Sequence, residues 1–316
     1  MKNRPQITVL VPLFNEEESL PHLKVAIDEV LEREKIKAEL LFVNDGSSDS
    51  SGQLLDEFAG SDKRVSVIHF RRNRGKSAAL EAGFRKAAGK YVITMDADLQ
   101  DDPNEIPNLI AELEKGYDMV SGWKRKRHDP ISKTLPSKFF NFIARLTSGI
   151  HLHDFNCGLK IYRREVLDTI ELYGELHRFI PMLVGSQGWR VGELVVQHHA
   201  RRWGKTKFGV SRFLSGFLDL LTVLFITRYA VQPMHLFGGI GVLTSLAGFV
   251  VLLYLTVLWF MGQGIGNRPL FLLGILLVIV GLQSFSIGLI GEMITHNHAA
   301  LRLLHKRESE KAGDES

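Results

Sequence analysis

The sequence contains a single cysteine, Cys157, among its 316 residues. One thiol excludes an internal disulfide framework and leaves no thiolate cluster for zinc, so we expect Cys157 to be an inert core residue. The sequence also lacks zinc-finger spacings, RNA-binding motifs and internal repeats. Its net charge is +4, and many of the basic residues adjoin apolar segments. This pattern favours anionic phospholipids and phosphate ligands over nucleic acid.

Charge is absent from two long runs near the carboxyl end, residues 236–261 and 269–291. Each run is longer than the roughly 20 apolar residues that cross a bilayer as a helix. The alternative, a helix hairpin inside a soluble core, seldom continues for so long without a charge. We therefore predict two transmembrane helices at about these positions.

Basic residues are frequent before these runs and in the tail after them, whereas the connector at 262–268 holds one. By the positive-inside rule, both ends of the chain face the cytoplasm, and we expect the protein in the inner cell membrane. The amino terminus does not fit a secretory signal, because its short apolar stretch runs directly into Glu16, Glu17 and Glu18.

These observations predict a soluble part followed by membrane segments. The predicted organisation is a cytoplasmic domain over residues 1–210, an interfacial helix over 211–230, the two membrane spans within 231–300 and a cytoplasmic tail over 301–316. A basic and aromatic stretch near 132–149 predicts an amphipathic helix, either on the membrane surface or packed as an ordinary helix. The membrane segments allow a homodimer or homotetramer, and the sequence leaves that choice open.

The first part of the chain alternates between β-rich runs and helical patterns. The four β-rich runs are residues 7–11, 40–43, 65–70 and 91–95. This alternation predicts an α/β fold with right-handed crossovers and a mostly parallel, Rossmann-like sheet. In such sheets ligands bind beyond the carboxyl ends of the strands, so the loops that follow these runs are the expected site.

The most specific of these loops contains Asp96, Asp98 and Gln100, directly after the fourth run. Two carboxylates separated by one residue can hold a hard divalent cation, which takes oxygen ligands and often bridges to diphosphate oxygens. The pair alone is common by chance, and its place at a strand end makes it more specific. It predicts a Mg²⁺ or Mn²⁺ site at Asp96 and Asp98, with Gln100 as a further ligand.

Two other loops carry polar residues at strand ends. In the loop after the second run, Gly46 permits a tight turn, and Asp45 is suited to accept hydrogen bonds from a base or ribose. Ser48 or Asp49 is alternatively a helix cap. The loop after the first run contains Pro12, Leu13, Asn15 and Glu16, and it is either a nucleotide-binding loop or a simple strand-to-helix turn. These four residues are candidates because they lie together in this loop.

The segment Gly75-Lys76-Ser77 imitates the end of a phosphate-binding P-loop. The glycine that the motif requires five residues earlier is Phe70, and Arg71 and Arg72 would crowd the phosphate. ATP hydrolysis is therefore disfavoured. Lys76 remains a candidate to reach a donor phosphate as a point charge.

Taken together, Pro12-Leu13-Phe14-Asn15-Glu16, Asn44-Asp45-Gly46-Ser47-Ser48-Asp49, Asn73-Arg74-Gly75-Lys76 and Asp96-Ala97-Asp98-Leu99-Gln100 resemble the inverting family 2 glycosyltransferases. With two carboxy-terminal spans, the whole chain resembles the polyisoprenyl-phosphate glycosyltransferases, the relatives of dolichol-phosphate mannose synthase. The resemblance implies an A-type glycosyltransferase fold followed by interfacial helices and two transmembrane helices. It also implies Mg²⁺ or Mn²⁺, a UDP- or GDP-sugar donor, with UDP favoured, and a lipid monophosphate acceptor such as undecaprenyl phosphate.

The resemblance also implies roles for individual residues. For the nucleotide-sugar these are Pro12, Leu13, Asn15, Glu16, Asp45, Lys76, Asp96, Ala97 and Asp98, with Asp96, Asp98 and Gln100 at the metal. Candidates to grip the acceptor phosphate are Lys124, Arg125, Lys138, Arg201, Arg202, Lys205 and Lys207, of which Arg125, Lys138, Arg201 and Arg202 are favoured. Asp98 and Asp154 are the candidate catalytic residues.

For Asp154, the resemblance implies a general base or a group that orients the acceptor phosphate, and a turn or helix-cap aspartate is the alternative. His177 lies in another segment similar to the family, which we expect to close the floor of the site. A lipid phosphate is largely ionised near neutral pH, its second pKa being about 6, so cations matter more than a base for its attack.

Two other functions remain open at this point. A processive polysaccharide synthase shares the donor half, but the segment from Gln197 to Trp203 has one residue too many for the Gln-x-x-Arg-Trp signature of those enzymes. A non-catalytic membrane adaptor that only binds a nucleotide-sugar is the second, and the presence of Asp96 and Asp98 disfavours it. The sequence does not identify the sugar, because donor sugars differ by one or two hydroxyls.

Overall fold

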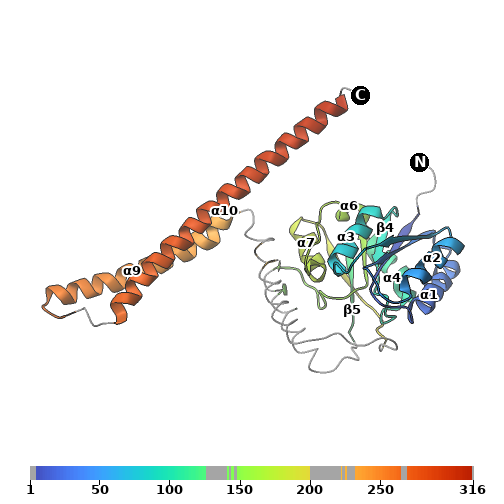
Figure 1. The fold of residues 1–316 in the computed structure, drawn as a ribbon, viewed down its shortest axis with the longest axis horizontal. Coiled ribbons are helices and arrows are strands. Elements are labelled where there is room, and N and C mark those ends of the chain that lie inside the picture. The colour runs from blue at the N-terminus through green and yellow to red at the C-terminus, as the bar shows by residue number, and fades with distance from the viewer. Residues whose placement is uncertain are drawn as a thin grey trace. The chain divides into compact units, whose positions relative to one another are not determined.

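The computed structural model describes residues 5–125, 148–199, 232–264 and 269–314, and the single positions 141, 144, 145, 222 and 225. The chain divides into two compact units, Met1–Val223 and Leu224–Ser316, both drawn in Figure 1. The amphipathic helix expected near 132–149 and the interfacial helix expected over 211–230 fall mostly outside the described residues.

The first unit is built on a seven-stranded sheet in the order β3-β2-β1-β4-β6-β5-β7. The strands β3, β2, β1 and β4 pair in parallel. Strand β6 runs antiparallel to both of its neighbours, β4 and β5, while β7 is parallel to β5. The predicted mostly parallel sheet is therefore confirmed, and the antiparallel β6 makes it a mixed one. Its strands are β1 (Ile7–Leu13), β2 (Ala38–Asn44), β3 (Val65–His69), β4 (Tyr91–Thr94), β5 (Met119–Trp123), β6 (Lys160–Arg163) and β7 (Val191–Val195).

Helices cover both faces of this sheet. Their bounds are α1 (Leu20–Arg33), α2 (Ser51–Ser61), α3 (Lys76–Lys86), α4 (Ile106–Glu114), α6 (Arg164–Leu167) and α7 (Ile180–Ser186), with 3-10 turns at η1 (Pro103–Glu105) and η2 (Leu176–Phe179). The apolar residues of α1 recur every three or four positions, as in Leu23, Ile27 and Leu31, so one side of the helix is buried.

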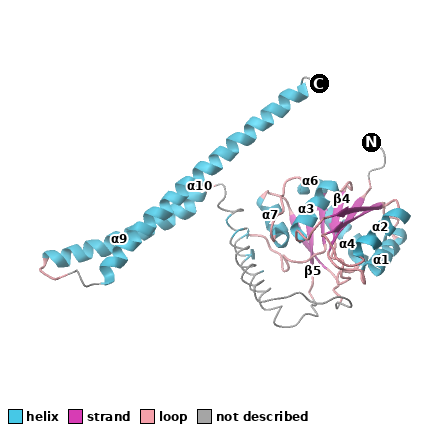
Figure 2. Ribbon diagram, viewed as in Figure 1, coloured by secondary structure: helices cyan, strands magenta, loops and turns pink. Residues whose placement is uncertain are grey.

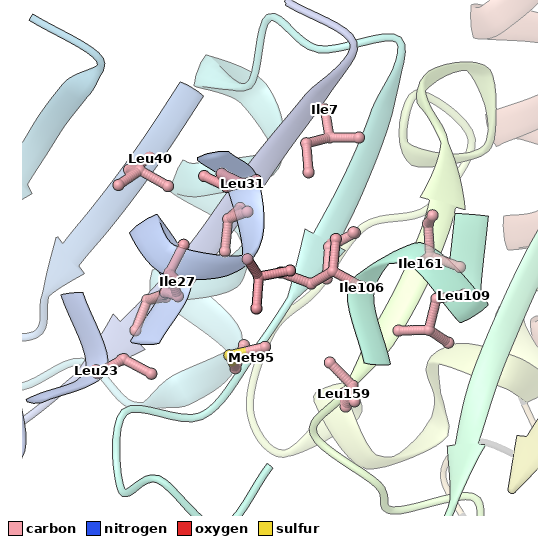
Figure 3. Packing of buried hydrophobic residues seen from close by; sticks show 14 of the residues in the cluster. Ile7, Leu23, Ile27, Leu31, Leu40, Met95, Ile106, Leu109, Leu159 and Ile161 are labelled. Carbon is pink, nitrogen blue, oxygen red and sulfur yellow. The ribbon is translucent and has the colours of Figure 1, made fainter. Parts of the chain in front are cut away.

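The main core lies between one face of the sheet and helices α1 and α4 (Figure 3). Ile7 and its alternate neighbours along β1 point into this core, because successive strand residues face opposite sides. The intervening Leu10 faces α3, where a side chain on Gly83 would overlap it at 2.3 Å. All seven residues of β1 are buried, as expected for a central parallel strand, and the strand continues two residues beyond the predicted end.

The carboxyl ends of the three central strands lie in register at one edge. Leu13 at the end of β1 pairs with Asn44 at the end of β2, and Leu10 pairs with Thr94 at the end of β4. The loops that follow leave the sheet through unusual backbone conformations, with a positive φ of 57° at both Asn15 and Leu99. The sheet therefore gathers the three loops singled out from the sequence.

The second unit is a pair of helices, α9 (Pro233–Phe260) and α10 (Pro269–Asp314), drawn in cyan in Figure 2. The segments Pro233–Phe260 and Pro269–Thr295 are long and apolar enough to cross a membrane. Helix α9 begins three residues before the predicted span. Helix α10 continues as a helix beyond the predicted end of its span and into the region expected as a tail.

Glycines bring the two helices into close contact. A side chain on Gly248 would meet the Gly274 carbonyl oxygen at 2.8 Å, and one on Gly241 would meet the Gly281 oxygen at 2.6 Å. Gly239 has no neighbour within 4 Å of a built Cβ. Helix pairs in lipid are held mainly by such close packing of small residues, since no hydrophobic force operates there.

We predict that Gly248→Leu separates α9 from α10, because the leucine overlaps backbone atoms that cannot move aside. Overpacking typically costs about 1–3 kcal/mol. The thermal unfolding midpoint of the detergent-solubilised protein should fall by several degrees, while the matched Gly239→Leu change should leave it nearly unaltered. Equal midpoints for both variants would contradict this packing.

Candidate active site

The loop after β1 is hydrogen-bonded to the loop after β2. The Asn15 backbone N–H donates to Ser47 Oγ at 2.9 Å, and the Ser48 backbone N–H donates to the side-chain Oδ1 of Asn15 at 2.8 Å. The Glu16 amide donates to Ser51 Oγ at 2.9 Å. These contacts join the predicted donor residues Asn15 and Glu16 to the serine-rich turn. Asparagine is one of the few residues other than glycine that adopt such a positive φ, and here its side chain is also held by Ser48.

The sequence offered Ser48 or Asp49 as the cap of the following helix, and neither is the cap: α2 begins after Ser50, which makes no side-chain cap bond. Asp49 Oδ1 accepts from the Ser51 amide at 3.0 Å, and its Oδ2 accepts from the Glu17 amide at 3.2 Å. Ser48, the other candidate cap, instead contacts Asn15.

Asp45 is buried, and both of its carboxylate oxygens are engaged by one short stretch of backbone. Oδ1 accepts from the Arg74 amide at 2.7 Å and Oδ2 from the Gly75 amide at 2.9 Å. The next residue, Gly46, has φ 71°, and a Cβ there would meet the Arg72 carbonyl carbon at 2.4 Å. Asp45 thus fixes the segment that starts helix α3, a positioning contact that sequence reasoning did not predict.

Lys76, the first residue of α3, forms an ion pair with Asp96 Oδ1. Partial burial alone would raise the pKa of Asp96. The charges of Lys76 and Lys124 outweigh it and lower that pKa to about 2. Asp96 is therefore ionised throughout the physiological range. Both side chains are about one-third exposed, 34% for Lys76 and 32% for Asp96, so the pair can be reached from solvent.

The rest of the acidic loop folds back on itself. Asp98 is nearly buried, and its Oδ1 accepts from the Gln100 amide at 3.2 Å. Asp101 is fully buried and pairs with Lys124 Nζ at 2.6 Å. Burial alone would lower the pKa of Lys124, but the carboxylate of Asp101 raises it above the usual value. Lys124 is therefore held inside the protein, which weighs against its candidacy as an acceptor-phosphate ligand.

The segment that leads into β6 packs against Asp96, a contact that was not predicted from the sequence. A Cβ on Gly158 would meet Asp96 Oδ2 at 2.5 Å, so the carboxylate packs against bare backbone. Thr94 Oγ1 donates to the Gly158 carbonyl at 2.9 Å. Lys160, only 3% exposed, donates its ammonium to the Cys157 carbonyl. Burial lowers the pKa of Lys160.

Cys157 is buried, as expected. Burial raises the pKa of its thiol to about 12, so the sulfur remains protonated and unreactive at neutral pH.

A small cavity of about 20 Å³ lies beside Asp96, and Lys76, Lys160, Asn156 and His177 are among its lining residues. His177 belongs to η2 and contacts α3, because its Nδ1 lies 3.0 Å from Ser77 Oγ. Burial, together with the charges of Lys76 and Arg178, lowers the pKa of His177 well below its ordinary value. The expectation that this segment forms the floor of the site agrees with these contacts.

Of the acceptor candidates, the structure describes Lys124, Arg125 and Asp154. Arg125 is exposed, and its guanidinium lies 5.9 Å from the centre of the Trp123 ring. Trp123 in turn stacks on His153 with ring centres 3.9 Å apart. Asp154 is buried, and its Oδ1 accepts from the Asn156 amide at 3.2 Å, which is a turn contact. Lys138, Arg201 and Arg202 lie outside the described residues, as do Lys205 and Lys207.

The segment that follows β7 is hydrogen-bonded to the acidic loop and to the residues just after it. The His199 amide donates to the Gln100 carbonyl at 2.9 Å, and His199 Nε2 lies 3.1 Å from Asp102 Oδ2. The Gln197 amide donates to Glu105 Oε1 at 3.1 Å. Residues 197–199, which come shortly before Arg201 and Arg202 in the sequence, are therefore held against the loop that carries Asp96 and Asp98.

The carboxylates fit a divalent ion that arrives with its substrate. Within the described part of the chain, no three His, Cys, Asp or Glu side chains converge into a complete metal cage. Mg²⁺ and Mn²⁺ that act on nucleotides usually take one or two carboxylates, with phosphate oxygens and waters as the other ligands. Asp96 is ionised and accessible, and Asp98 follows two residues later, so this loop offers carboxylate oxygens of the kind that such a set uses.

Comparison with known proteins decides the family. The family described as glycosyl transferase family 2 matches residues 8–171, more than half of the chain. The chain belongs to this family. The match runs from β1 to beyond β6 and includes the loops after β1, β2 and β4, so the family predicted from the sequence is confirmed.

Two relatives extend the similarity over the whole chain. A dodecaprenyl-phosphate galacturonate synthase of Rhizobium johnstonii is 36% identical over 93% of this chain and 88% of its own length. An undecaprenyl-phosphate 4-deoxy-4-formamido-L-arabinose transferase of Proteus mirabilis is 36% identical over 92% of this chain and 88% of its own. Both alignments extend into the membrane-type helices, because they cover nine-tenths of the chain.

Solved structures of other proteins share the fold. A glucosyl-3-phosphoglycerate synthase from Mycobacterium tuberculosis, crystallised with Mn²⁺ and UDP-glucose, superposes with a TM-score of 0.54 at 19% identity. The superposition covers 71% of this chain and 79% of that one. The likeness shows a common A-type glycosyltransferase fold, which confirms the predicted fold class.

Asp45→Asn tests the contact between Asp45 and the start of α3. An amide nitrogen must replace one of the two accepting oxygens and face a backbone N–H, so one hydrogen bond to a charged acceptor is lost. We expect a loss of about 2 kcal/mol in unfolding free energy and weaker binding of UDP by calorimetry. Glu57→Gln, an exposed change on α2, is the control. Unaltered stability in Asp45→Asn would show that the contact is dispensable.

The lowered pKa of His177 predicts that the protein loses stability in mild acid. The unfolded chain takes up a proton on this histidine below about pH 6.5, whereas the folded protein keeps the imidazole neutral because its pKa is lowered. The stability is fully present above pH 6.5 and falls as the pH falls, by up to about 1 kcal/mol at pH 5.5. The thermal midpoint of His177→Gln should therefore decrease less between pH 7.5 and 5.5 than that of the wild type. The exposed His151→Gln serves as control, and parallel pH profiles for all three proteins would contradict the assignment.

Proposed function

We propose that this protein transfers a sugar from a nucleotide-sugar to a polyisoprenyl phosphate, with inversion at the anomeric carbon. The observation that carries the proposal is the assembly of Asp45, Lys76 and Asp96 at one sheet edge, on a chain that continues into two helices long enough to span a membrane. Relatives named for dodecaprenyl and undecaprenyl phosphate match it over nine-tenths of its length. A lipid-linked monosaccharide for the cell envelope is the proposed product.

The donor is proposed to lie beyond the carboxyl ends of β1, β2 and β4. Asp45 shapes the turn before α3, and Lys76 lies within reach of a diphosphate near Asp96. Asp96 and Asp98 would hold Mg²⁺ or Mn²⁺, with Gln100 as a further ligand. Such an ion, when bound, neutralises the departing nucleoside diphosphate. A UDP-sugar is favoured, in keeping with the UDP-glucose in the fold neighbour.

The acceptor phosphate carries its own negative charge, so the protein needs cations to bind it more than a base to activate it. We propose Arg125, Lys138, Arg201 and Arg202 as these cations. Asp154 is proposed to orient this phosphate or to act as a base. Its bond to the Asn156 amide shows that it also holds a turn.

The protein is proposed to lie in the inner membrane with its catalytic domain and both termini in the cytoplasm, as the distribution of basic residues indicates. There the donor, which is soluble, and the acceptor, which is a lipid, meet at one surface. A homodimer or homotetramer through the membrane helices is part of the proposal.

The alternatives are less favoured. A processive synthase needs a channel for its polymer, whereas the described helices include two candidate spans. A non-catalytic adaptor needs no ionised carboxylate beside a diphosphate site, and Asp96 is ionised.

Asp98→Asn tests the reaction directly. The change removes a proposed metal ligand with little change in shape, and losing such electrostatic stabilisation typically costs about 100-fold in rate. Purified protein would be incubated with a panel of UDP- and GDP-sugars, Mg²⁺ or Mn²⁺, and undecaprenyl phosphate, and sugar in the lipid extract would be measured. We expect transfer by the wild type and by the exposed control Glu165→Gln, and loss of transfer with EDTA.

Full activity of the Asp98→Asn protein, or release of nucleoside diphosphate that is equally fast without the lipid, would sink the proposal.

A further inference from the structure

Lys76 is more exposed to solvent than the other two lysines near Asp96. Three lysines, Lys76, Lys124 and Lys160, lower the pKa of this aspartate. Lys124 is paired with buried Asp101, and Lys160 is buried with its ammonium on the Cys157 carbonyl. Lys76 alone among the three keeps about one-third of its side chain exposed, and its partner Asp96 is exposed to the same degree. Lys76 is therefore the lysine of this group that can leave Asp96 without unmaking a buried contact.

The backbone before Lys76 is held in place, while its side chain is partly exposed. Asp45 holds the amides of Arg74 and Gly75, directly before Lys76. Gly75 has φ 88°, and among the described residues no atom lies within 4 Å of a Cβ built on it. A lysine has four rotatable side-chain bonds and a compact charge. Its ammonium can thus move within a short radius around a fixed backbone.

The carboxylate that Lys76 occupies is also the one proposed to hold a divalent ion. An ammonium and a divalent cation compete for the same oxygen, since both are attracted to its charge. If a cation alone displaced Lys76, two more positive charges would join Lys124 and Lys160, and the ammonium would lose its partner. A diphosphate that arrives with the cation removes both penalties, because it offers the ammonium new oxygens.

We infer that the Lys76 ammonium occupies the Asp96 carboxylate in the ligand-free enzyme. When a divalent cation binds that carboxylate, the ammonium moves to the donor diphosphate. The inference rests on the proposed function for the identity of the diphosphate. Its consequence is that free enzyme binds the cation weakly, and that cation and nucleotide strengthen each other's binding. By thermodynamic linkage the strengthening is equal in both directions.

Binding of Mn²⁺ to the purified, detergent-solubilised full chain tests the exchange. Free Mn²⁺ is measured by electron paramagnetic resonance, without nucleotide, for the wild type and for Lys76→Met. Removing the competing ammonium should tighten Mn²⁺ binding about tenfold. The same variant should bind UDP or GDP, whichever the wild type binds, about tenfold more weakly in the presence of Mn²⁺. Lys76→Gln, which keeps a polar side chain, should behave like Lys76→Met and serves if the latter is unstable.

Two controls assign the effect. Lys86→Met removes the same charge from the exposed far end of α3 and should leave Mn²⁺ affinity unaltered. Adding Asp96→Asn to Lys76→Met should abolish the gain, because the oxygen at issue is then no longer charged.

Mn²⁺ affinity in Lys76→Met that is unchanged or weaker than in the wild type, or too weak to detect in both, would overturn the exchange. The two proposals fail separately. Sugar transfer to lipid with unaltered Mn²⁺ affinity removes the exchange and leaves the function. Tighter Mn²⁺ binding in a protein that transfers no sugar to lipid removes the function and leaves the exchange.

Discussion

The ion pair between Lys76 and Asp96 is the contact at which the separate motifs of this protein meet. Asp96 lies two residues after the central strand β4, and Lys76 is the first residue of α3. Asp45, directly after β2, holds the backbone before Lys76 by two hydrogen bonds. Opposite charges close together favour their charged forms, so the carboxylate is ionised despite its partial burial. A parallel sheet makes this possible, because its strands end at the same edge and deliver their loops to one place.

Much of this arrangement follows from the sequence. Alternating β-rich and helical runs predict the parallel half of the sheet, and the charge-free runs predict two long apolar helices. The acidic pair Asp96 and Asp98 could be placed at a strand end from the buried run before it. The order of the four motifs then pointed to the family, and the match over residues 8–171 agrees.

What the sequence could not show depends on contacts between distant segments. Strand β6 runs antiparallel between β4 and β5, and nothing in the short run at 160–163 indicates that Lys160 becomes buried beside Asp96. A lysine in a strand normally indicates an exposed position. Likewise, Asp45 has the composition of a ribose ligand, but both of its oxygens bind backbone nearly thirty residues ahead. The glycines of α9 and α10 show their role only when the helices lie side by side.

The Lys76–Asp96 pair is proposed to bind a diphosphate, and the same chain carries two carboxy-terminal helices that are long and apolar enough to cross a membrane. The most direct test is the structure of the lipid product. After incubation with the accepted nucleotide-sugar and undecaprenyl phosphate, mass spectrometry should find one sugar on each lipid phosphate, and NMR should find the anomeric configuration opposite to that of the donor. Oligosaccharide chains on the lipid, retention of configuration, or a sugar found only in water-soluble material would contradict the account.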